Sequence, residues 1–175
     1  MLYACWKIHD MDRLATGSNG RIISPVTYSE EQIEALVTDT IEINEKIVRI
    51  KGFQVLTYQT PKYTEELRQK IKTVYCSNFS IYFDSEPKDR FEDFFCQLSN
   101  FATNLAKDHC FTDGNKRTTV KVSFALIGYR GIQLDIQDSP DPEQNELYKW
   151  IQDIVIGTKS QDELAQTLRD HATNL

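Results

Sequence analysis

The sequence predicts an all-α domain, a bundle of helices with one short β element. Over most of the chain, apolar residues recur about every 3.6 positions, and residues that start or stop helices bound these segments. One short segment, residues 53–58, is instead rich in residue types that favour strands, which suits a hairpin arm or flap. We therefore expect the helices to pack directly on one another.

The first half of the chain carries two helix-start signals. Ser29 and Gln32 form a capping box, and apolar residues follow at helical spacing until a glycine ends the helix at position 52. A Thr-Pro pair then opens a second helix, expected over 61–75. Residues 76–88 are expected to form a loop that carries aromatic side chains.

The second half contains the clearest helical pattern, an aromatic-rich apolar stripe over residues 91–105. Another helix is expected from 115 until the glycine at 131, and a third over 141–157, from an Asp-Pro start to a glycine stop. A second capping box, Ser160 with Glu163, starts the last helix. These helices form a bundle around the pair that flanks residues 109–114.

Composition excludes several classes of protein. A length of 175 residues suits one domain, and a net charge of −6 argues against nucleic-acid binding driven by bulk charge. Between Lys107 and Arg130, however, there are five cations and only two acids. A local positive patch in an acidic protein suits a small anionic ligand. We expect no direct contact with nucleic acid.

The cysteine pattern and hydropathy bear on location. The four cysteines lack metal-binding spacing and suit reduced thiols. No apolar run has transmembrane length, and the first residues do not resemble a signal peptide. We therefore expect a cytoplasmic protein without a membrane partner.

One segment of nine residues concentrates the groups that carry chemistry. It reads His109-Cys110-Phe111-Thr112-Asp113-Gly114-Asn115-Lys116-Arg117. The imidazole of His109 can accept a proton from a hydroxyl near neutral pH, and Asp113 offers the hard oxygen ligand that Mg²⁺ prefers. Phe111, between them, is expected to point into the core and fix the loop.

The last four residues of the segment lie at the expected start of a helix. The free N–H groups there bind phosphate, and Gly114 lets the backbone approach an anion closely. Asn115 can bond a phosphate oxygen or brace the loop, while Lys116 and Arg117 supply positive charge. Cations in a first turn oppose the helix dipole, and such exceptions tend to mark sites. Taken singly, each residue also fits an ordinary cap, turn or solvated surface.

The run His109-x-Phe111-x-Asp113-Gly114-Asn115-Lys116-Arg117 resembles the signature of the Fic/Doc family, HxFx(D/E)(G/A)N(G/K)R, at all seven defined positions. The resemblance covers about residues 28–171, the expected domain, and leaves 1–27 as an extension without a match. It implies a Fic/Doc-type helical bundle in which 53–58 is the target-positioning flap. It further implies ATP as substrate, His109 as the base, Asp113 as the Mg²⁺ ligand, and residues 114–117 as the phosphate site.

Two positions favour the Doc (death-on-curing) branch. Fic enzymes that transfer AMP usually have Gly where this chain has Lys116, and a second Arg where it has Val120. The resemblance to Doc implies a toxin of a toxin–antitoxin pair. Such a toxin transfers the γ-phosphate of ATP to a threonine of the translation factor elongation factor Tu and arrests translation.

The expected restraint on such a toxin is a separate, small antitoxin that folds on it. The pattern Thr27-x-x-x-Glu31-Gln32 misses the last position of the inhibitory (S/T)xxxE(G/N) motif, and we interpret it as the start of the first helix. Two alternatives stay open. One is a Fic-type protein AMP- or NMP-transferase, and the other is an inactive Fic-fold module that only binds.

Overall fold

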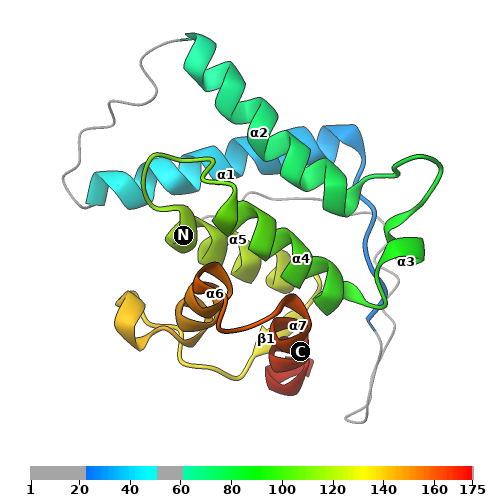
Figure 1. Cartoon of the computed structure of the whole chain (residues 1–175), viewed down its shortest axis with the longest axis vertical. Coiled ribbons are helices and arrows are strands. Elements are labelled where there is room, and N and C mark those ends of the chain that lie inside the picture. The colour runs from blue at the N-terminus through cyan, green and yellow to red at the C-terminus, as the bar shows by residue number, and fades with distance from the viewer. Residues whose placement is uncertain (1–22, 51–60, 175) are drawn as a thin grey trace.

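The computed structural model describes residues 23–50 and 61–174, which form an α-helical bundle (Figure 1). The helices are α1 (Glu30–Ile50), α2 (Pro61–Phe79), α3 (Pro87–Arg90), α4 (Phe94–Lys107), α5 (Asn115–Tyr129), the 3₁₀ turn η2 (Pro142–Gln144), α6 (Glu146–Ile156) and α7 (Gln161–His171). The all-α prediction is confirmed. The expected flap at 53–58 lies outside the described residues.

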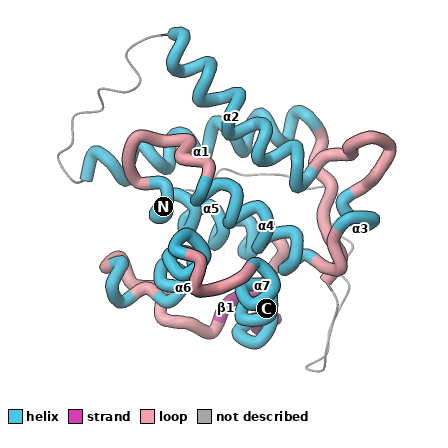
Figure 2. Tube along the Cα trace, viewed as in Figure 1, coloured by secondary structure: helices cyan, strands magenta, loops and turns pink. Residues whose placement is uncertain are grey.

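Among the described residues, a two-stranded antiparallel sheet is the remaining regular element. Strand β1 (Ile132–Leu134), which follows α5, pairs with β2 (Ala172–Asn174), which follows α7. Figure 2 shows β1 as a short magenta segment beside α7. The sheet ties the end of α5 to the end of the described chain. None of the described helices is both long and apolar enough to cross a membrane.

Helix α4 is the central element, and it packs against α2, α5, α6 and α7 (Figure 1). Its fully buried apolar residues recur at helical spacing: Phe94, Leu98, Phe101 and Leu105. The apolar stripe predicted a helix from residue 91, but α4 begins at Phe94. Asp93 is its N-cap and accepts a hydrogen bond from the Cys96 N–H. The same carboxylate accepts from Arg169, which fixes α7 to the start of α4.

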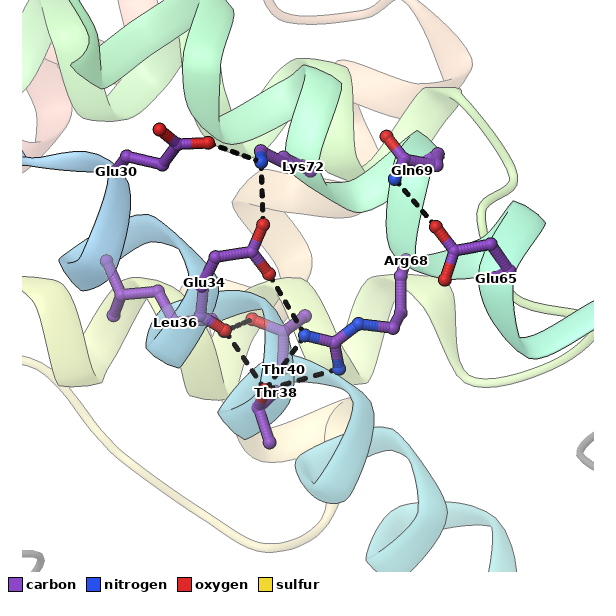
Figure 3. Close-up of polar contacts among 9 residues, drawn as sticks. All are labelled: Glu30, Glu34, Leu36, Thr38, Thr40, Glu65, Arg68, Gln69 and Lys72. Carbon is purple, nitrogen blue, oxygen red and sulfur yellow. Dashed lines mark hydrogen bonds and ion pairs between the residues drawn. The ribbon is translucent and has the colours of Figure 1, made fainter. Parts of the chain in front are cut away.

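Charged side chains set how α2 lies along α1 (Figure 3). Arg68 donates to Glu34 at 3.1 Å and to Thr38 at 3.2 Å, and Lys72 pairs with Glu34 at 2.6 Å and with Glu30 at 3.1 Å. Hydrogen bonds from Lys72 and then Arg68 lower the pKa of Glu34. Exposed pairs of this kind contribute little to stability, so their main effect is on the register of the two helices.

Helix α2 is longer than the sequence indicates. The segment expected to be a loop over 76–88 begins with its last turn, and Phe79 is fully buried, with its ring 5.2 Å from that of Phe101. Arg90 accounts for the difference, because it donates to the carbonyls of Ser77 and Ser80 at 2.6 Å each and so satisfies the end of the helix. The rest of the segment is a loop followed by the short helix α3.

The helix expected over 141–157 is two elements. Asn145 separates η2 from α6, because its side chain accepts from the Tyr148 N–H and donates to Asp138 and to the Ser139 carbonyl. The predicted stop is confirmed, since Gly157 caps α6 with φ of +82°. Both predicted capping boxes are also present, at the starts of α1 and α7.

A buried amide joins the segment before α1 to the bundle. Gln97 is fully buried in α4, accepts from the Val26 N–H at 2.8 Å, and donates to the carbonyls of Val26 at 2.7 Å and Asn78 at 2.9 Å. One side chain therefore satisfies three backbone groups, two of partly buried Val26 and one of buried Asn78.

Gln97→Leu is expected to lower the free energy of unfolding by about 2–4 kcal/mol, because it removes the partner of these three buried or partly buried backbone groups. Urea unfolding followed by circular dichroism measures the change. Gln69→Leu is the control, since Gln69 is exposed and its side chain bonds the exposed Glu65. Equal stability of the two variants would contradict this role for Gln97.

Candidate active site

The loop between α4 and α5 carries the sequence motif and is drawn as the pink connection between these helices in Figure 2. Phe111 is only 4% exposed and anchors the loop in the core. Asn115 braces it, because its side chain accepts from the Phe111 N–H at 2.9 Å and donates to the Phe111 carbonyl at 2.7 Å. The sequence allows Asn115 either to bond a phosphate oxygen or to brace the loop, and in this structure it braces the loop.

Gly114 turns the chain from this loop into α5. It is the N-cap, with φ of +79°, a conformation that favours glycine. The Asn44 side chain of α1 lies directly against it and donates to the Asp113 carbonyl at 2.9 Å and to the Thr118 hydroxyl at 3.0 Å. A Cβ at position 114 would lie 3.0 Å from the Asn44 amide nitrogen. The turn is thus fixed by its own conformation and by α1.

A carboxylate lies over the start of α5. Asp113 accepts from the Gly114 N–H at 2.6 Å through one oxygen, and its other oxygen is 3.6 Å from the Arg117 guanidinium. An anion therefore already sits where the helix dipole, a backbone donor and an arginine converge. Because the Asp113 side chain is half exposed, at 49%, it can turn away and leave these groups to another anion.

Lys116 lies apart from this group. Its ammonium donates to Gln152 of α6 at 2.9 Å and lies 5.8 Å from the centre of the Tyr148 ring. The structure therefore brings Asp113, Gly114 and Arg117 together and directs Lys116 toward α6. A phosphate contact by Lys116 stays a prediction.

His109 lies on the α2 side of the loop. It is exposed, and its φ of +46° is a strained conformation for a residue other than glycine, of the kind that clusters at functional sites. It lines a cavity of about 120 Å³ with its loop neighbours and with residues of α2: Tyr63, Glu66, Leu67, Lys70, Cys110, Phe111 and Thr112. The candidate base is thus open to solvent beside a small polar cavity.

The cysteine next to His109 is not a rival nucleophile. Burial raises the pKa of the Cys110 thiol to about 11, so the thiol is protonated at neutral pH. Its side chain is buried at 4% exposure and packs with the core.

Arg117 lines a second cavity, of about 230 Å³, between α1, α5 and the segment before α6. Its walls are mostly apolar, and the lining residues include Ile47, Val120, Lys121 and Tyr148. Val120 of α5 is itself buried. Lys121 lines the same cavity from an exposed position, where it lies 3.8 Å from Asp138.

The residues that the structure describes contain no cluster of three or more metal-ligating side chains. Asp113 is the one carboxylate in the turn, so it fits a Mg²⁺ ion whose other ligands are phosphate oxygens and water. This donor set is typical of magnesium that arrives with a nucleotide and not of an all-protein metal site.

Sequence reasoning missed Asn44. It is a polar side chain on the apolar stripe of α1 and only 2% exposed. A buried amide requires hydrogen-bond partners, so its position on the stripe was a usable signal.

The family model that describes the Fic/DOC family matches residues 29–125 of this chain. The match covers more than half of the chain and includes α1, α2, α4, the motif loop and most of α5. A comparison with curated proteins found no match.

Gly114→Val is expected to lower the free energy of unfolding by about 2–4 kcal/mol, because a β-branched residue is strained at this φ and its Cβ overlaps the Asn44 amide. Urea unfolding measures the loss. Gly128→Val is the matched control, since a Cβ there meets nothing within 4 Å. If both variants unfolded at the same urea concentration, the proposed constraint at Gly114 would be wrong.

Proposed function

Because the chain belongs to the Fic/DOC family, whose members are typically transferases acting on protein hydroxyls, we propose that it is a Doc-like toxin. In this proposal it moves the γ-phosphate of ATP to a Thr or Ser hydroxyl of a translation factor, elongation factor Tu, and arrests translation. Residues 28–171 form the transferase domain, and a small antitoxin protein restrains it.

The observation that carries the proposal is the anion position at the start of α5. The Gly114 N–H and the Arg117 guanidinium already bind the Asp113 carboxylate there. A phosphate oxygen offers these donors the same negative charge and more acceptor sites, so displacement of the carboxylate by a nucleotide is chemically reasonable. Displacement also frees Asp113 for a metal ion.

The reaction needs a base on the same loop, and His109 supplies it. The oxygen of the target hydroxyl forms a bond to the γ-phosphorus while the bond from that phosphorus to the β-phosphate oxygen breaks, which releases ADP. The hydroxyl proton passes to the imidazole of His109. Arg117 and the α5 N-terminus stabilise the charge on the transferred phosphoryl group.

Asp113 would hold the Mg²⁺ that accompanies ATP, as members of this family typically require. The ion would neutralise phosphate charge when bound. The chain's own part is to keep a half-exposed carboxylate next to the phosphate position.

Val120 favours phosphoryl transfer. The side chain that would hold the γ-phosphate in the AMP-transfer orientation is absent at this position, and a buried valine lines the cavity instead.

One observation supports the runner-up, a nucleotidyltransferase, because Lys121 lines the same cavity and offers a cation one residue further along α5. The presence of both His109 and Asp113 argues against an inactive binding module.

The first test supplies the protein and a bacterial lysate with ATP labelled at either the α- or the γ-phosphate. We expect label from the γ-position alone on a protein of elongation-factor size.

His109→Ala is expected to lower the rate of label transfer at least about 100-fold, because proton removal is lost. His109→Asn, which tolerates a positive φ but lacks the base, serves as the control for backbone strain and is expected to be equally inactive. Transfer from the α-position would establish the nucleotidyltransferase, and full activity of both variants would exclude His109 as the base.

Asp113→Asn is expected to raise the Mg²⁺ concentration for half-maximal activity about tenfold or more, because an anionic ligand is lost. The amide oxygen still accepts the Gly114 N–H, so the turn is retained. A magnesium titration of label transfer measures the effect. Asp108→Asn, a nearby exposed carboxylate at the end of α4, is expected to leave the titration unchanged. An unchanged magnesium curve for Asp113→Asn would exclude it as the ligand.

A further inference from the structure

We propose that Lys70 of α2 selects the target by binding an acidic side chain one or two residues from the acceptor hydroxyl. This inference rests on the proposed transfer to a protein hydroxyl and names a recognition element that the reaction itself does not require. It follows from the separation of the two cavities at the motif loop.

The base and the phosphate position open on different sides of the loop. His109 lines the 120 Å³ cavity that faces α2, whereas Arg117 lines the 230 Å³ cavity that faces α1 and α6. A hydroxyl that gives its proton to His109 must therefore come to the α2 side. The smaller cavity has room for only a few water molecules, so it suits side chains next to the acceptor rather than a nucleotide.

Three residues of α2 present polar groups to this cavity at helical spacing: Tyr63, Glu66 and Lys70. The Tyr63 and Thr112 hydroxyls, 3.4 Å apart, connect the helix to the loop. A target chain whose hydroxyl reaches His109 lies alongside this row.

The charges in the row are not equivalent. Glu66 already has a cation partner, since its carboxylate lies 3.9 Å from Lys62. Lys70 is exposed and forms no ion pair with a carboxylate in the described part of the chain. Lys70 is the cation of this row and has no carboxylate partner in the described part of the chain, so its complement is an Asp or Glu of the target.

The position of Lys70 is fixed from the opposite flank of α2. Arg68 and Lys72 bind Glu34 of α1, and Leu67 and Ile71 are buried between the two flanks. Figure 3 shows Arg68 and Lys72 directed at α1. These contacts and the buried residues set the rotation of α2, so the residues on its other flank face the His109 side.

The test begins with the hydroxyl that the wild-type chain labels in a bacterial lysate, located by mass spectrometry. We expect an Asp or Glu within two residues of it. Replacing that acid in the purified target by Lys is expected to raise KM about fivefold with little change in kcat, because an exposed ion pair is lost. Lys70→Glu is expected to raise KM similarly for the natural target and to restore it for the charge-reversed target.

Lys149→Glu is the matched control, because Lys149 is exposed on α6, lines neither cavity and gives the same change in net charge. It is expected to leave KM unchanged for both targets. A labelled hydroxyl without a neighbouring acid, or a Lys70→Glu variant with unchanged KM, overturns the role of Lys70 and leaves the transferase intact. Absence of any labelled hydroxyl overturns both proposals.

Discussion

Asn44 donates from its side-chain amide to the Asp113 carbonyl and to the Thr118 hydroxyl, and so joins α1 to both sides of the turn at Gly114. The turn needs a left-handed backbone and leaves no room for a side chain beneath it. Because α5 begins at this turn, the direction of its free N–H groups is set here. The position of Arg117 and the orientation of the loop with His109 both depend on the same contact.

The electrostatics of the turn favour exchange of one anion for another. Two cations in the first turn of α5 oppose the helix dipole, which by itself destabilises the helix start. In the structure the Asp113 carboxylate offsets part of this cost by pairing with Arg117 and accepting from the Gly114 N–H. The Lys116 ammonium instead donates to the neutral amide of Gln152. A site that holds its own carboxylate loosely is ready to accept a phosphate, since the donors are already oriented.

Helix α2 connects the core to the acceptor side of the site. Its buried stripe packs on α4, one flank is bound to α1 by ion pairs, and the other flank faces His109. Helix α4 both packs against α2 and ends at Lys107, just before the motif. It therefore positions α2 and the motif loop relative to each other. Packing of α4 thereby fixes the separation between the base and the residues that meet the target.

The sequence by itself determined the features that depend on neighbouring residues. Both capping boxes, the glycine stop at 157 and the all-α class follow from contacts within one helical turn or from apolar spacing, and they appear as expected. The motif also identifies the family, because its residue types lie within nine positions. These features are readable because each is fixed by residues close together in the chain.

Only the tertiary structure decided which groups meet across the chain. Asn44 beneath Gly114, Lys116 on Gln152, Lys70 beside His109 and the last turn of α2 at Phe79 all depend on partners well separated in sequence. The pairing of β1 with β2 joins Gln133 to Thr173, which lie 40 positions apart in the chain. Such contacts arise from how buried faces fit together, and local periodicity shows which face is buried but not what lies against it.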